Sequence, residues 1–229
     1  QWDSLFNQEL RTQEQSLVFV KRMLVLAVST ITYLRGIFPE DAYRSRYLED
    51  LCIKVLKENC TTPGACKIVK CCQGIVVLFY CIECNLYPIF KQVHRDPDDT
   101  NHVIESYQFK FKYTDHGPQM DIIRNENIEL RVTMEDTKAA SILLIRKLFL
   151  LMQNLDALPN DVYLTMKLYY YDDVTPSDYE PPGFKEGVCD SLWFEGTAVH
   201  FRVGDLQTPF HVLKVGVAAE QGRVSKLQE

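Results

Sequence analysis

The eight cysteines are the residues of this 229-residue chain with the clearest chemical potential. Seven lie between Cys52 and Cys84, and Cys81 and Cys84 form a C-x-x-C motif. A redox C-x-x-C follows a strand and opens a helix, and a zinc site needs a second spaced pair, whereas Cys71 and Cys72 are adjacent. We therefore predict reduced cysteines that serve as small buried side chains, which fits a nuclear or cytoplasmic compartment. The alternative, a thiol or zinc protein, would use Cys66, Cys71, Cys72, Cys81 and Cys84.

The five histidines do not form a recognisable catalytic or metal-binding pattern. His200 and His211 could be neighbours across a hairpin, but we interpret them as surface residues on strands. A glycine-rich phosphate-binding loop is also missing from the sequence. The sequence therefore predicts neither an enzyme nor a cofactor. The histidines are His94, His102, His116, His200 and His211.

The charge balance argues against nucleic acid as a direct partner. The formal net charge is -6 and the pI is about 5.4, so a basic face is not expected. Gln108, Lys110 and Lys112 alternate with aromatic residues, whereas single-strand-binding platforms carry aromatic and basic residues on the same face. RNA or single-stranded DNA binding is thus a minor alternative. The apolar run 74–82 is too short for a membrane span, and we predict a buried helix there.

Three helices are predicted before residue 91. Apolar residues recur every three or four positions over 13–35, and Gly36 then supplies a left-handed helix end. We predict a second helix from Pro39 to about Asn59 and a third from Thr62 to about Phe90, bent near Pro88. A fourth helix is predicted to begin near residue 133 and to end near residue 154. It is apolar nearly all round, so we expect cover on two sides.

Strands are predicted in the remaining segments. Residues 107–113 alternate strictly, with the aromatic side chains directed towards the core, and residues 162–170 alternate in the same way. Shorter strands are expected at 192–195, 198–203 and 210–217. Gly196 and Gly204-Asp205 are predicted to be turns between them. The order of elements predicts an α+β domain with helices packed on a largely antiparallel sheet.

An irregular segment, residues 172–190, separates two of these strands. It contains Pro176, Pro181 and Pro182. Loops of this length inside a compact domain are usually functional or disordered. We interpret it as a mobile segment that docks aromatic residues against the sheet.

Several strings, taken together, carry a family resemblance. Residues 31–40 (ITYLRGIFPE), 107–113 (YQFKFKY), 140–147 (ASILLIRK), 164–170 (LTMKLYY) and 181–185 (PPGFK) resemble animal meiotic HORMA-domain proteins, relatives of the yeast Hop-type chromosome-axis proteins. The resemblance extends from about residue 13 to residue 217.

The resemblance implies a fold and a mode of binding. It implies a single HORMA domain over 1–229, with a three-helix layer on the sheet, a core over about 13–171, a "safety belt" over about 172–217 and a tail from 218. The belt wraps a closure-motif peptide that adds a strand to a sheet edge. The family's linker and own closure motif are expected to lie beyond Glu229, outside this sequence.

The resemblance also implies partners and a place in the cell. Expected partners are closure motifs of axis proteins or of the family's own tails, an AAA+ remodelling ATPase with a small HORMA adaptor, and further copies of the protein. The expected location is the meiotic axis in the nucleus, where the family supports double-strand-break formation and homologous recombination. A spindle-checkpoint or DNA-repair polymerase adaptor is the alternative within the fold.

We expect peptide and belt contacts on the fourth helix, on the strand after it and within the belt. The helix is expected to line the cleft, and the belt is expected to dock through aromatic residues. The candidate residues are Leu144, Lys147, Leu148, Leu151, Tyr169, Tyr171, Pro182, Phe184, Trp193, Phe194, Phe201 and Val203.

Overall fold

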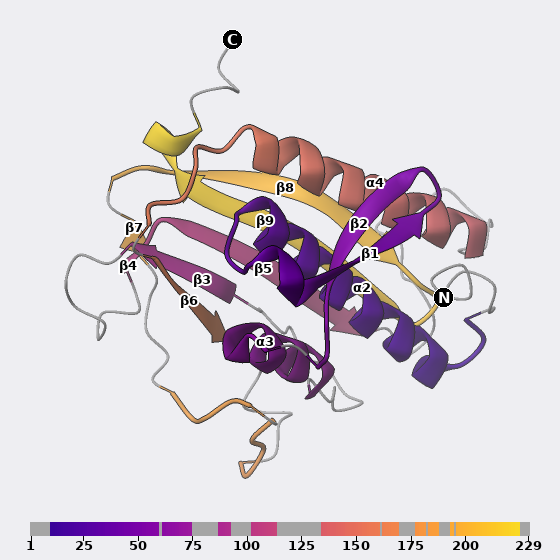
Figure 1. Cartoon of the computed structure of the whole chain (residues 1–229). Coiled ribbons are helices and arrows are strands. Elements are labelled where there is room, and N and C mark those ends of the chain that lie inside the picture. The colour runs from indigo at the N-terminus through magenta and orange to yellow at the C-terminus, as the bar shows by residue number, and fades with distance from the viewer. Residues whose placement is uncertain are drawn as a thin grey trace.

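A computed structural model describes most of the chain: residues 10–59, 61–74, 87–92, 102–113, 134–160, 162–169, 177–181, 183–187, 193–194 and 196–224. In this described part, helices α2 (Gln13–Leu34), α3 (Pro63–Gly74) and α4 (Met134–Gln153) accompany a five-stranded sheet. Helices α2 and α4 pack against each other and against the sheet, and α3 packs beside α2 (Figure 1). The chain thus has the α+β architecture that the sequence predicts.

The sheet has the strand order β6-β3-β5-β9-β8, and all of its pairs are antiparallel. A separate parallel pair joins the short strands β4 (His102–Val103) and β7 (Trp193–Phe194). Two strands therefore form the edges of the large sheet, β6 on one side and β8 on the other. The bounds of the sheet strands are Tyr87–Gln92 for β3, Glu105–Tyr113 for β5, Val162–Lys167 for β6, Ala198–Gln207 for β8 and His211–Glu220 for β9.

Helix α2 is the centre of the core, and its ends confirm the prediction for 13–35. Thr12 and Gln15 form a capping box in which each side chain accepts a hydrogen bond from the other residue's backbone N–H, at 3.2 Å. Gly36 ends the helix with a φ of 65°. The helix is long and apolar enough to cross a membrane, but here its apolar face is buried by the protein itself, Met23 and Leu24 included.

The predicted helix from Pro39 to Asn59 is wrong. A short 3-10 turn, Glu40–Ala42, leads into a hairpin of β1 (Tyr43–Leu48) and β2 (Leu51–Leu56). Glu49 adopts a φ of 54° in the turn between these strands. Tyr43, Tyr47, Ile53 and Val55 favour strands, and the apolar spacing alone did not reveal this preference. The hairpin lies across α2, where the Leu56 amide donates to Ser29 Oγ at 3.1 Å.

The predicted third helix is correct only at its beginning. Helix α3 starts at Pro63, as expected, but Tyr87–Gln92 is strand β3 rather than the end of a bent helix. The backbone of Pro88 lies opposite Met166 of β6. The middle of the predicted helix, with the run 74–82 that was expected to be a buried helix, lies largely outside the described residues.

Later elements agree better with prediction. The helix near 133–154 and all the predicted strands are present, although β8 and β9 are longer than expected and β6 ends at Lys167, before the predicted end at residue 170. Tyr107, Phe109 and Phe111 are buried, as their alternation predicts. Gly196 does lie between β7 and β8, with a φ of 91°. The turn predicted at Gly204-Asp205 is wrong, because both residues belong to β8, where the pairing with β9 shifts register.

Helix α4 is not covered on all sides. Leu144, Ile145 and Leu148 are buried, whereas Leu143 and Leu150 are 52% and 63% exposed. The expectation of cover on two sides is therefore wrong for the face that carries Leu143 and Leu150.

Candidate functional site

Strand β6 provides a sheet edge that could receive another strand. Among the described residues it pairs with β3 on one side only, and it ends the five-stranded sheet. Edge strands present unpaired N–H and C=O groups along one side, and an extended peptide can pair with them. The chemistry available here is therefore backbone hydrogen bonding.

The opposite edge, β8, is packed beneath helix α4. A Cβ added at Gly204 of β8 would lie 3.4 Å from Cδ1 of Leu144. Val203 and Leu206 of the same strand are buried. Of the two edge strands, β8 is thus the one that packs against a described helix, and β6 has no comparable contact with the described helices.

After β6, the chain reaches β7, which pairs with β4 outside the five-stranded sheet. The backbones of Trp193 and Phe194 pair in parallel with His102 and Val103. Strand β4 contacts the end of β3 and lies near the beginning of β6 (Figure 1). Trp193 is 49% exposed and Phe194 is partly buried. This pairing fixes one point of the predicted belt.

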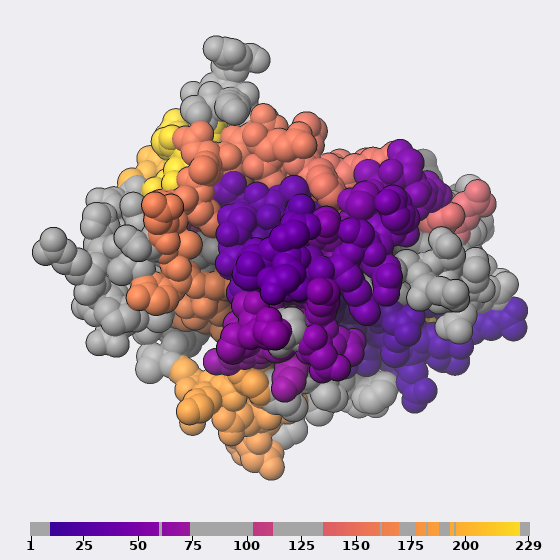
Figure 2. Space-filling view, viewed as in Figure 1, coloured from indigo at the N-terminus to yellow at the C-terminus, as the bar shows by residue number. Residues whose placement is uncertain are grey.

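A second fixed point lies on helix α3. The Cys71 thiol donates to the carbonyl oxygen of Gly183 at an Sγ–O distance of 3.6 Å. Gly183 has a φ of 89°, and a Cβ at this position would lie 2.7 Å from Cys71 Sγ. Pro181 is buried and Phe184 packs against the core. Figure 2 shows this segment, in orange, directly below the surface of α3.

These two fixed points differ in chemistry. The pairing at β7 uses backbone groups, whereas the contact at Gly183 depends on the absence of a side chain. Burial raises the pKa of the Cys71 thiol, so the neutral form that donates to the carbonyl predominates near pH 7. The segment between them belongs to the predicted belt.

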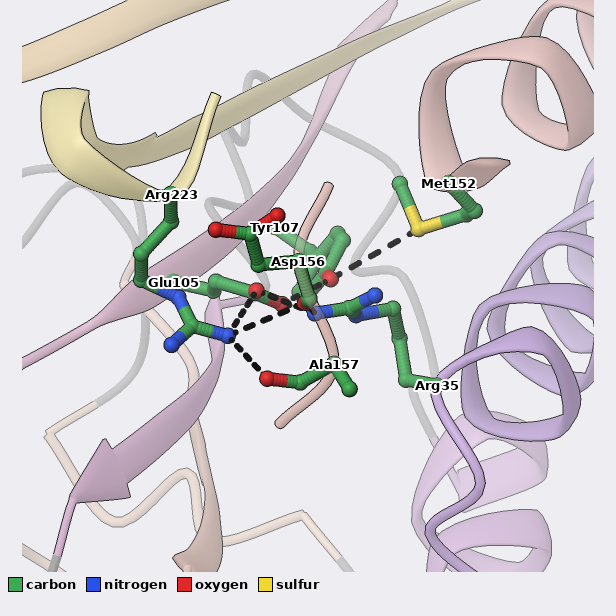
Figure 3. A network of polar contacts seen from close by, with 7 residues as sticks. All are labelled: Arg35, Glu105, Tyr107, Met152, Asp156, Ala157 and Arg223. Carbon is green, nitrogen blue, oxygen red and sulfur yellow. Dashed lines mark hydrogen bonds and ion pairs between the residues drawn. The ribbon is translucent and has the colours of Figure 1, made fainter. Parts of the chain in front are cut away.

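A buried cluster of charged residues holds the end of the C-terminal hairpin, which is formed by β8 and β9 (Figure 3). Arg35, which follows α2, donates to both carboxylate oxygens of Glu105, at 3.0 and 2.5 Å. Arg223, which follows β9, donates to Glu105 Oε1 at 3.3 Å. The side chain of Glu105 is fully buried and that of Arg35 is 3% exposed. Buried charges require such partners, so this cluster depends on all three residues.

Further hydrogen bonds connect this cluster to the loop after α4. Arg35 and Arg223 both donate to the carbonyl oxygen of Asp156, at 2.6 and 3.2 Å. The Tyr107 hydroxyl donates to Glu105 at 2.6 Å, and burial together with that carboxylate raises the tyrosine pKa well above 10. The cluster thus joins α2, β5, the loop after α4 and the end of β9.

A second buried polar cluster holds the other end of the hairpin. Ser16 Oγ of α2 lies 2.5 Å from Thr208 Oγ1 and 2.6 Å from His211 Nδ1. His211 is 2% exposed, so its predicted surface position is wrong. Burial lowers its pKa to about 4. His200 is exposed, as predicted, but it pairs with Ala218 and not with His211.

The described cysteines are all reduced. Cys71 and Cys72 are buried, and burial raises the pKa of Cys72 to about 12. Cys66 is partly buried and Cys52 is exposed. Within the residues that the structure describes, no group of three or more His, Cys, Asp or Glu side chains is arranged so that it could hold a metal ion. The C-x-x-C motif lies outside the described residues.

The candidate residues from the sequence fall into three groups. The helix residues Leu144, Leu148 and Leu151 are core side chains, and of these Leu144 contacts β8. Lys147 is exposed on the outer face of α4. The helix therefore lines strand β8 rather than the edge strand β6.

The remaining candidates lie just after β6 or within the predicted belt, which includes β8. On β8, Val203 is buried and Phe201 packs partly against the core. Tyr169 follows β6 and is partly buried. Trp193, Phe194 and Phe184 lie at the two fixed points. Tyr171 and Pro182 lie outside the described residues.

Sequence reasoning missed Arg35, Glu105 and Arg223. A signal for Glu105 was available, because the alternation that buries Tyr107 and Phe109 also directs residue 105 to the core. A buried carboxylate needs a cation, and Arg35 follows the best predicted helix. The contact between Cys71 and Gly183 joins residues 112 positions apart, and no local pattern indicates it.

Comparisons with known proteins agree on the fold. HORMA domain-containing protein 1 of Homo sapiens is 50% identical over 224 residues, which are 97% of this chain and 56% of that protein. The protein of the same name from Xenopus laevis is 51% identical over 218 residues, or 95% of this chain and 56% of that protein. The chain thus spans little more than half the length of these relatives.

Solved structures give the same result at lower identity. The structure of C. elegans HTP-2 bound to a HIM-3 closure motif matches with a TM-score of 0.79 and 17% identity, over 95% of this chain and 96% of that chain. A chain of the mitotic checkpoint complex matches with a TM-score of 0.59 and 18% identity, over 90% of this chain and 98% of that chain. The family model of the HORMA domain matches residues 16–211, so this chain, with its helices on the β6-to-β8 sheet, belongs to the HORMA domain family.

Proposed function

We propose that this chain is an adaptor of the meiotic chromosome axis that binds closure-motif peptides along the free edge of β6. The observation that carries the proposal is an open edge strand whose following segment has fixed points at β7 and at Gly183. A peptide paired with β6 would lie between the sheet and that segment. It is a binding module rather than an enzyme.

The relatives support this function. The C. elegans proteins HTP-2 and HTP-1 share the fold and were solved bound to closure motifs of HIM-3 and HTP-3. The relatives of about 50% identity are animal HORMA domain proteins. We infer that the present chain uses the same mode of binding.

The proposed division of the chain follows from this mode. Residues 13–171 are the core, residues 172–217 are the belt and the tail begins at 218. Strand addition supplies affinity through backbone hydrogen bonds. A belt closed over the peptide slows its release, because the belt must detach before the peptide leaves.

We place the protein in the nucleus, on meiotic chromosomes, where it supports axis assembly, double-strand-break formation and homologous recombination. Its partners are closure motifs in axis proteins or in the tails of its own family. An AAA+ ATPase with a small HORMA adaptor would reopen the belt. Assembly of several copies would follow if each tail carried a motif.

The direct test uses peptides tiled across the full length of human HORMA domain-containing protein 1, together with the HIM-3 closure motif. At least one should co-elute with the 229-residue chain and protect residues 172–217 from protease. Methylation of alternate peptide amides should abolish binding, because a paired strand donates every second N–H to the edge. The proposal fails if none of the peptides is retained, or if N-methylation at every position leaves retention unchanged.

A second candidate is an adaptor of another HORMA branch, in spindle checkpoint or repair-polymerase function. The match to the mitotic checkpoint complex favours it, although with a lower TM-score than the HTP-2 match. Retention of peptides from checkpoint or polymerase proteins, with no retention of the tiled set, would support this candidate. A thiol or zinc protein would instead contain stoichiometric zinc or react rapidly with thiol reagents.

A further inference from the structure

The row of β6 side chains that packs against the core is only half buried. Val162, Leu164 and Met166 are apolar and contact the core cluster, yet each remains partly exposed. On the central strand β5, Tyr107 and Phe109 of the corresponding row are both 0% exposed. The difference follows from position, because a central strand has a neighbour on each side and an edge strand has only one.

The alternate row of β6 has a different character. Tyr163 is 51% exposed and Thr165 is partly exposed. These side chains point to the opposite face of the sheet, because successive residues of a strand alternate. A peptide beside β6 would therefore meet a continuous apolar row that packs on the core on one face. On the other face it would meet the exposed Tyr163 and the polar Thr165, which do not form a continuous apolar row.

From this difference we infer that the peptide is recognised by apolar side chains at every second position. Three such side chains, at positions n, n+2 and n+4, would lie beside Val162, Leu164 and Met166. They would bury the parts of these three side chains that remain exposed at the edge of the sheet. The two positions between them would lie beside Tyr163 and Thr165 and would tolerate many residue types. This inference rests on the proposed function and specifies the chemistry of its ligand.

The binding free energy would come from burial of apolar surface and not from the pairing of charges. Adjacent strands place neighbouring side chains of one face about 5 Å apart, which is contact distance for aliphatic groups. Each methylene group buried there should favour binding by about fourfold. The face that carries Tyr163 and Thr165 lacks a continuous apolar row and should give a smaller gain, so selectivity should concentrate on the face of Val162, Leu164 and Met166.

The test is selection of a displayed random seven-residue library on the 229-residue chain. Retained peptides should be enriched in aliphatic residues at three alternate positions, with little preference between them. Met166→Ala should shift one of these positions towards larger apolar residues, because the substitution leaves space beside it. Thr165→Ala is the matched control on the other face and should leave the three apolar preferences unchanged.

The outcomes separate this inference from the proposed function. Only folded molecules of the variant retain peptides, so the residue preferences among retained peptides do not depend on how much of the variant is folded. A destabilised Met166→Ala variant therefore still gives a result. Retained peptides without alternation, or an equal shift with both variants, would overturn the inference and leave edge binding intact. Failure of the wild-type chain to retain any peptide, from this library or from the tiled set, would overturn both.

Discussion

The residue with the greatest structural importance is Glu105. Its buried carboxylate is shared by Arg35 and Arg223, which come from opposite ends of the described chain, and by the Tyr107 hydroxyl. Removing one partner of a buried ion pair leaves an uncompensated charge. This one side chain therefore connects the core to the end of the C-terminal hairpin.

Glu105→Gln should lower the free energy of unfolding by about 3 kcal/mol, because two guanidinium groups lose their counter-charge. Urea denaturation at pH 7 measures the change. Asp50→Asn is the matched control, since Asp50 pairs with Arg146 at an exposed site, and its loss should be below about 1 kcal/mol. Equal losses of unfolding free energy in the two variants would show that the buried cluster contributes no more stability than an exposed ion pair.

His211 predicts a pH dependence of stability. Its pKa is about 4 in the folded chain and near 6.5 when solvated. The unfolded chain therefore takes up the proton first as pH falls. The stability associated with neutral His211 is complete above pH 6.5 and is lost as pH falls from about 6.5 towards 4.

The loss from this histidine should be on the order of 2 kcal/mol. Urea unfolding at several pH values between 7 and 4 measures it. His211→Asn removes the titrating group and should make the fall between pH 6.5 and 4 shallower. Parallel pH profiles for the variant and the wild type would show that His211 is not the group responsible.

Among the elements, the contact between α3 and residues 181–184 makes the sharpest prediction. Gly183→Ala should loosen the segment, because its Cβ would clash with Cys71 Sγ and its φ of 89° disfavours alanine. We expect faster protease cleavage within 177–187 and faster release of a bound peptide. Gly187→Ala is the control, since a Cβ there meets nothing within 4 Å.

A double variant separates the clash from the backbone strain. Cys71→Ala in the Gly183→Ala background should restore part of the protection, because the sulfur that the new Cβ meets is gone. Backbone strain at residue 183 would remain, so rescue should be incomplete. Additive effects of the two substitutions would contradict direct contact between these residues.

The helices and strands also show what the sequence could predict. Helix α2 and strand β5 follow from local periodicity, since each buries one regular face. Segment 43–56 was predicted incorrectly because its apolar spacing fits a helix face, whereas its hairpin depends on packing across α2. Strand β3 lies between β5 and β6, which come later in the chain, and such long-range pairing has no local signal.

The candidate site was predictable in outline only. The irregular, proline-marked segment indicated where the chain leaves the regular fold, and the alternation at 162–170 indicated a strand. The resemblance identified the segment as a belt. The positions of its fixed points could not be predicted, because they depend on residues such as Cys71 that lie on distant elements.

For the whole molecule, the important feature is that the two edge strands of the sheet differ in their contacts with the helices. Helix α4 covers β8, and the hairpin β8–β9 is held at one end by Ser16 and at the other by Glu105. The described helices do not cover β6. A partner strand can therefore be added on one side without disturbing the core.

Hydrogen–deuterium exchange with and without a retained peptide tests this account most directly. The account predicts slower exchange at alternate amides of residues 162–167 and across the proposed belt, 172–217, with little change on the outer face of α4. Protection at β8 or on the outer face of α4, with β6 unchanged, would contradict it.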